Sequence, residues 1–229
     1  MRKLLYVPII HTAPDLGSIA PLIEQRSSEI CGKERWDKHK ETVYLFWDSL
    51  SRYFDTVKAP ELKIYQDGLM ASGELGRKII EEGAARGSKN HQIVLKLIQR
   101  DGEIRKTEDV SLLKKEYDYI LRLAQTKSPF EKGLVYFGYK RDKYRLLEER
   151  DKFVANTINE TLKEGEFGVL FIGVYHDVLH RLARDIIVRE VKEREKVKAY
   201  FEELLHGGDD DRFNQLAEYL ASPVSSESF

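Results

Sequence analysis

The sequence predicts an α/β fold in which a mostly parallel central sheet is flanked by helices. Short apolar segments typical of buried strands alternate with longer segments in which apolar residues recur every three or four positions, as on one face of a helix. The run Val-Leu-Phe-Ile at 169–172 is apolar without interruption, which is typical of a strand covered on both faces. The 229 residues are enough to bury a sizeable core.

In the first half of the chain, strands are predicted over residues 4–10 and 62–65 and an extended piece over 103–106. Residues 11–17 are interpreted as a loop, after which Ser18 would cap a helix that contains Pro21 in its first turn. Further helices are predicted over 36–54, 72–87, 89–100 and 110–125.

In the second half, the pattern predicts a proline-containing loop at 128–132, a long helix over 144–164, the buried strand at 169–172 and a helical segment at 177–184. Residues 185–192 fit either a continuation of that helix or an edge strand, and their β-branched residues favour the strand. Helices over 193–205 and 212–221 follow, and 222–229 is interpreted as a frayed tail.

These elements predict one α/β domain over residues 1–205, with a helical insertion at about 72–125. Residues 206–229 are interpreted as a linker, an amphipathic helix and the tail. The charged C-terminal helices are a candidate surface for homo-oligomer formation.

Composition narrows the class of protein. A net charge of −1 provides no polybasic surface for nucleic acid. The single cysteine, Cys31, allows no internal disulfide and fits a reducing compartment. The N-terminal apolar stretch is short, contains Pro8 and lacks a cleavage site, so it fits a first strand better than a signal peptide. No segment is long enough to span a membrane, and we expect a soluble, cytoplasmic protein.

Polar residues follow three of the predicted strands. His11 ends the first strand, Asp67 follows the second, and His176 follows the strand at 169–172. Ligands of open α/β sheets bind beyond the carboxyl ends of the strands, so these side chains are expected at one rim. Two imidazoles and a carboxylate suit a divalent metal site with His11 and His176 as ligands, or acid–base catalysis. Ordinary loop histidines, and an Asp67-Gly68 turn, are the plainer alternatives.

Arg150 adds a fourth candidate. It falls within the apolar stripe of the helix predicted over 144–164, where a guanidinium needs an anionic partner or ligand. Alternatively, it extends to the rim or pairs with a structural carboxylate. The neighbouring Asp151 lies off this stripe and is expected in solvent, and Glu108, before the predicted helix at 110–125, could face the rim. His39 is expected on the surface.

Three segments resemble motifs of known families. Gly173-Val-Tyr-His176 matches a late strand that ends in Gly-x-x-His, and Glu149-Arg150-Asp151 matches the arginine-containing helix before it. Pro8-Ile-Ile-His11 matches an early Gly-x-x-His motif in part, with proline in place of glycine. The chain therefore resembles the TraB/Tiki group and the wider erythromycin-esterase-like and haem-binding ChaN-like proteins, over residues 145–178 and 3–18. Asp67 and Glu74 are the two candidates for the mid-chain glutamate of these families.

The resemblance implies an α/β scaffold with a pocket, in families described as metal-dependent proteases, esterases or regulators. One hypothesis is a hydrolase of a small molecule or peptide, in which His11 and His176 bind a divalent metal or act as general base, and Asp67 assists. Arg150 would then hold an anionic substrate group or a developing oxyanion. The rival hypothesis is a non-catalytic binding or regulatory protein in which the histidines and Arg150 form a buried polar network.

Overall fold

The predicted parallel sheet is present in the computed structural model. The structure describes the backbone of residues 1–17, 20–57, 61–115, 118, 129–207 and 209–225, and their side chains except those of residues 16, 22–23, 129–141 and 143. Among these residues, five strands form one all-parallel sheet in the order β3-β2-β4-β1-β5. The strands are β1 (Arg2–Ile9), β2 (Lys63–Gln66), β3 (Glu103–Arg105), β4 (Phe167–Gly173) and β5 (Ile186–Glu190).

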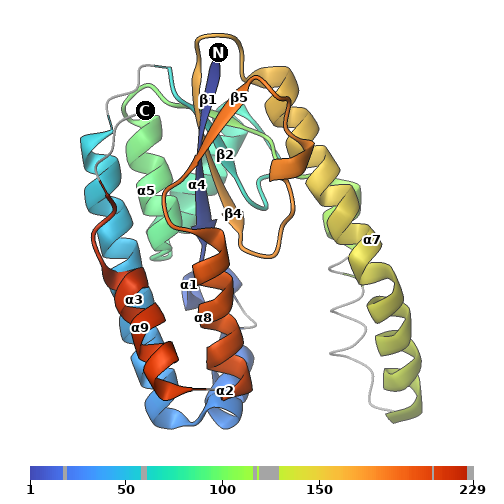
Figure 1. Cartoon of the computed structure of the whole chain (residues 1–229). Coiled ribbons are helices and arrows are strands. Elements are labelled where there is room, and N and C mark those ends of the chain that lie inside the picture. Colours follow the sequence, from blue (N-terminus) through green and yellow to red (C-terminus); the bar gives the residue numbers. More distant parts are fainter. Residues whose placement is uncertain (18–19, 58–60, 116–117, 119–128, 208, 226–229) are drawn as a thin grey trace.

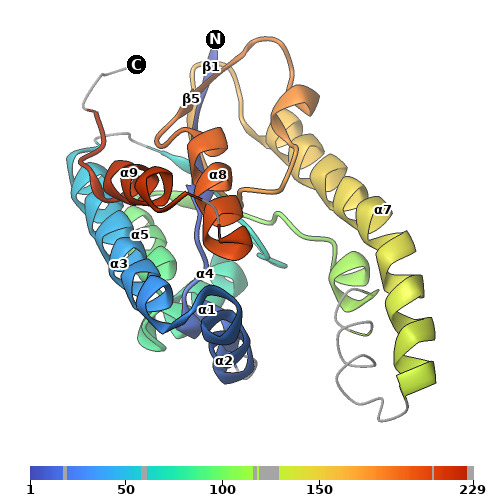
Figure 2. The ribbon, with the colours of Figure 1, turned by 60° about the horizontal axis from the view of Figure 1, so that its bottom comes forward.

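Helices cover both faces of this sheet (Figure 1). On one face, side chains of α3, α4, α5, α8 and α9 join a large apolar core, whereas α7 covers the other face with a smaller one. The two views show the N-terminal half of α7 extending beyond the sheet (Figure 2). The helices are α1 (Ala13–Leu16), α2 (Ala20–Cys31), α3 (Lys33–Thr56), α4 (Gly73–Ala85), α5 (Lys89–Ile98), α7 (Pro129–Thr161), α8 (Arg194–His206) and α9 (Asp210–Ala221).

The alternation of side chains along β1 explains why both faces need cover. Leu5 and Val7 point into the larger core, and Leu4 and Tyr6 into the smaller one, because successive side chains of a strand face opposite ways. The uninterrupted apolar run of β4 is fully buried, as predicted from its composition.

The strand register brings three strand ends to one rim. The carboxyl end of β1 pairs with that of β4, where Ile9 lies opposite Gly173. On the other side of β4, Gln66 at the end of β2 lies opposite Phe171. The residues that follow these strands therefore enter the same space.

Two of the predicted loops and one predicted helix are wrong. Residues 13–16 form the short helix α1, because the carboxylate of Asp15 accepts hydrogen bonds from the backbone and hydroxyl of Thr12. The predicted loop at 128–132 lies largely in α7, which begins at Pro129, where a proline loses no helical hydrogen bond. The Ser18 cap lies outside the described residues, as does most of the helix predicted over 110–125; residues 110–115 are helical.

The segment at 177–184 contains only a 3-10 turn, η2 (Leu179–Arg181), instead of the predicted helix. Its backbone bonds to side chains of α7, since Asn159 accepts from Ala183 N at 2.8 Å and donates to Arg181 O at 3.1 Å. These contacts replace the bonds of a helix. Beyond this turn, residues 186–190 form β5, the edge strand that the β-branched residues favour.

The C-terminal helix packs within the chain. Phe213, Ala217 and Leu220 of α9 are buried in the larger core, where α9 contacts α3 and α8. Self-association through the C-terminal helices stays a prediction. No described helix is both long and apolar enough to cross a membrane.

Candidate functional site

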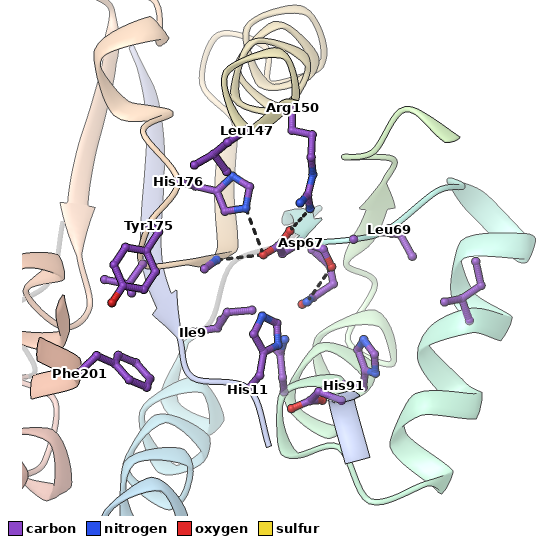
Figure 3. A pocket seen from close by; sticks show the side chains of 17 residues that line it. Ile9, His11, Asp67, Leu69, His91, Leu147, Arg150, Tyr175, His176 and Phe201 are labelled. Carbon is purple, nitrogen blue, oxygen red and sulfur yellow. Dashed lines mark hydrogen bonds and ion pairs between the residues drawn. The ribbon is translucent and has the colours of Figure 1, made fainter. Parts of the chain in front are cut away.

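A pocket of about 650 Å³ opens at the rim where β1, β2 and β4 end (Figure 3). His11, Asp67, Arg150 and His176 all line it. The four candidates thus come from four separate segments of the chain, and the sheet register together with the packing of α7 brings them together.

His176 is held on both sides of its ring. The turn after β4 places it, with its amide donating to Gly173 O at 3.0 Å. Its Nδ1 lies 2.5 Å from Oδ1 of Asp151, whose other oxygen accepts from the Asp177 amide at 2.9 Å. Its Nε2 lies 3.7 Å from Oδ2 of Asp67. The imidazole, which is 6% exposed, therefore lies between two carboxylates.

The expectation that Asp151 is solvated is wrong, since its side chain is 4% exposed. It lies three and four residues before Val154 and Ala155, which are fully buried against the sheet, so all three share one helix face. The buried face of α7 thus extends beyond the predicted apolar stripe to include Asp151. Arg150 remains half-buried beside it and lines the pocket.

Asp67 connects the histidine to Arg150. Its Oδ2 accepts from the Gly173 amide at 3.0 Å, and its Oδ1 lies 3.3 Å from Nη2 of Arg150 (Figure 3). Burial raises the pKa of Asp67, but the nearby charges of His176, Arg150 and His11 outweigh burial and lower it below the ordinary value. Asp67 is therefore an anion at neutral pH.

Arg150 pairs with a second carboxylate, that of Glu108, which is fully buried. Arg150 Nε lies 3.0 and 3.1 Å from the two carboxylate oxygens of Glu108, and Nη2 lies 2.5 Å from Oε1. Burial raises the pKa of Glu108, although Arg150 opposes this rise. Of the two interpretations of Arg150, pairing with protein carboxylates matches these contacts.

Glu108 reaches the rim because its segment is attached to the loop after β2. The amides of Thr107 and Glu108 donate to Leu69 O at 2.9 and 3.0 Å, and the Thr107 hydroxyl donates to Gln66 O. The Thr-Glu-Asp run at 107–109 has the local pattern of a helix cap, which obscured this role in the sequence.

The electrostatics of His176 favour its protonated form. Burial lowers its pKa, but Asp67 and the hydrogen bond to Asp151 raise it by more, so the pKa lies above 6.5. A proton on Nδ1 is directed to Asp151, which leaves Nε2 as the nitrogen that titrates toward the pocket.

His11 is exposed and lines the same pocket, close enough for its charge to lower the pKa of Asp67. The predicted pairing of His11 with His176 on a divalent metal finds no further support. Within the part of the chain that the structure describes, no group of three or more His, Cys, Asp or Glu side chains is placed to hold a metal ion. We therefore assign no step to a metal.

Searches for related proteins add no family or function. No family model, no curated protein and no solved structure matches this chain. The resemblance to TraB/Tiki and erythromycin-esterase-like proteins stays a prediction, and the site has to be interpreted from its own geometry.

Proposed function

We propose that this pocket is the active site of a hydrolase in which His176 is the general base and then the general acid. The observation that carries the proposal is the position of the imidazole, with Nδ1 2.5 Å from Asp151 and Nε2 3.7 Å from Asp67 at the wall of a pocket. A buried carboxylate that holds one ring nitrogen fixes the tautomer and stabilises the imidazolium that forms during catalysis.

The proposed reaction is hydrolysis of an ester or amide of a small molecule or peptide. A water molecule that bridges Nε2 of His176 and Oδ2 of Asp67 loses a proton to Nε2 as its oxygen attacks the substrate carbonyl. The proton then moves from Nε2 to the leaving oxygen or nitrogen as the bond to carbon breaks. Asp67 orients the water.

Arg150 is a positioning residue in this proposal, because its contacts with Asp67 and Glu108 hold the Asp67 carboxylate in place. His11, which lies on the side of Asp67 away from Arg150 in Figure 3, is the candidate to donate a hydrogen bond to the carbonyl oxygen as negative charge develops.

The test is turnover of a panel of p-nitrophenyl esters and chromogenic peptide amides. We expect His176→Gln to lower kcat about 10²- to 10⁴-fold, and Asp151→Asn to lower it in the same direction because the ring loses its tautomer constraint. Asp177→Asn is the matched control, since that neighbouring carboxylate is 62% exposed. Turnover that survives His176→Gln would rule out the proposed role of this histidine.

A binding protein is the second candidate. It is favoured by the fact that Arg150 already pairs with two carboxylates, as in a structural polar network. It predicts ligand binding without turnover, and a wild-type protein inactive on the whole panel would favour it.

A further inference from the structure

Two buried side-chain carbonyl oxygens, on residues that line the pocket, have no hydrogen-bond partner among the described residues. They are Oε1 of Gln66 and Oδ1 of Asn90, on side chains that are 2% and 3% exposed. Buried polar atoms are nearly always paired, so each such exception calls for an explanation. Both atoms belong to uncharged amides, unlike the ionic groups around His176.

The orientation of the Gln66 amide follows from its neighbour. Its Nε2 donates to the backbone oxygen of Asp67 at 3.3 Å. A carbonyl oxygen can only accept, so the nitrogen must face it and Oε1 must be the end that lacks a partner.

Asn90 is placed by a capped helix. It is the second residue of α5, whose first turn is held by Ser88, since the Ser88 hydroxyl accepts from the His91 amide at 3.1 Å. Gln66 and Asn90 therefore both stand on regular structure, which fixes where their side chains begin.

The adjacent His91 also lines the pocket, and its Nδ1 is likewise buried without a hydrogen-bond partner among the described residues. A methyl group at Gly83 would lie 1.9 Å from Nδ1 of His91, so this nitrogen packs against α4. Burial lowers the pKa of His91, which keeps the ring neutral at physiological pH.

Two carboxylates also line this pocket. They belong to Asp15 and Asp67, and the Arg150 guanidinium is already paired with Asp67 and Glu108. The imidazoles of His11 and His176 line the pocket beside these carboxylates, so the preference for a ligand that donates hydrogen bonds rests on the unpaired acceptors and not on net charge.

We propose that Gln66 and Asn90 form a recognition subsite that accepts hydrogen bonds from N–H or O–H groups of the ligand: an ammonium, an amide or a hydroxyl. As a statement about substrate, this rests on the proposed hydrolase function. The substrate is then an ester or amide whose non-reacting end bears a hydrogen-bond donor. An acceptor-only anion would leave both carbonyl oxygens unpaired and meet Asp15 and Asp67.

The experiment compares four probes of matched size: propylammonium, propionamide, 1-propanol and propionate. Their binding to the full chain is followed by NMR shifts of the Gln66 and Asn90 side-chain amides, and of backbone amides at Asp67 and His91. Gln66→Met and Asn90→Leu remove one acceptor each while keeping side-chain volume. Gln92→Met is the matched control on α5, because Gln92 does not line this pocket.

We expect the three donor probes to bind and propionate to bind more weakly or not at all. Each acceptor variant should weaken donor binding by about fivefold or more, while Gln92→Met should not change it. The relative affinities of the three donor probes identify whether the subsite prefers an ammonium, an amide or a hydroxyl. Equal binding of propionate, no binding of any donor probe, or unchanged affinity in both acceptor variants would overturn the subsite.

Failure of the two proposals can be told apart. His176→Gln should bind the four probes like the wild-type protein, because it leaves Gln66 and Asn90 unchanged. A wild-type protein that binds the donor probes but turns over no substrate of the panel would contradict only the hydrolase. Conversely, turnover whose KM is unchanged by both Gln66→Met and Asn90→Leu contradicts only the subsite.

Discussion

Two histidines, His176 and His39, are both 6% exposed, yet their surroundings differ in kind. His176 lies at the rim of the sheet between the carboxylates of Asp67 and Asp151. His39 lies on α3, where its Nδ1 is 3.0 Å from the Tyr200 hydroxyl and its ring is 4.7 Å from that of Trp36. The sequence predicted His39 on the surface, and this expectation is wrong.

The two environments move the two pKa values in opposite directions. Burial lowers the pKa of His39 to about 4, because no neighbouring charge compensates for the loss of water. Burial also lowers the pKa of His176, but its two carboxylates reverse the effect. At equal burial, the pKa of His39 is therefore lowered and that of His176 is raised, and the difference lies in the charged partners.

The largest expected effect comes from breaking the ionic network around His176. Arg150→Leu should destabilise the protein by about 3–5 kcal/mol, because it leaves Glu108 and Asp67 buried without their cation. The measurement is urea unfolding. Arg150→Leu combined with Glu108→Leu should recover part of the loss, since the second change removes one stranded carboxylate. A single variant as stable as the wild-type protein would contradict the network.

The second-largest expected effect is the pH dependence of stability that His39 contributes. His39 resists protonation in the folded state, so below its unfolded pKa the unfolded chain binds the additional proton. Stability should fall as pH decreases from 6.5 to about 4, by up to about 3 kcal/mol from this residue. His39→Phe should flatten this part of the profile in urea unfolding from pH 4 to 7. If stability depends on pH in His39→Phe as it does in the wild-type protein, other groups cause the loss of stability at low pH.

The smallest expected effect is the pH dependence of stability that His176 contributes, and its sign is opposite to that of His39. Its raised pKa contributes stability that is complete below pH 6.5 and is lost as pH rises through the folded pKa. In the proposed hydrolase, kcat should rise over the same interval as the base becomes neutral. Asp151→Asn should shift both transitions to lower pH. NMR titration of His176 measures the pKa directly, and a value at or below 6.5 would contradict the assignment.

The fold and three members of the site follow from local patterns. Apolar runs and helical periodicity depend on neighbouring residues, so they predict an α/β chain with a parallel sheet. Parallel strands end at one rim, which is sufficient to group His11, Asp67 and His176. The predicted position of Arg150 needed one more local signal, its place near the apolar stripe of α7.

The partners of these residues depend on contacts between distant segments. Asp151 and His176 are 25 residues apart in the chain, and Glu108 and Arg150 are 42 apart. The buried face of α7 extends beyond its apolar stripe to Asp151, and the periodicity of apolar residues does not reveal a carboxylate that is buried beside them. His39 shows the same limit, because Tyr200 and Phe201 of the distant helix α8 contact its ring.

The sequence by itself therefore determined the α/β class, the parallel arrangement of the strands and which strand ends bear polar groups, since these depend on local composition and period. Contacts between distant segments select which carboxylate meets each imidazole or guanidinium, and thus which histidine has the raised pKa. Burial and pairing are set by elements that meet across the fold, and a pKa responds to both.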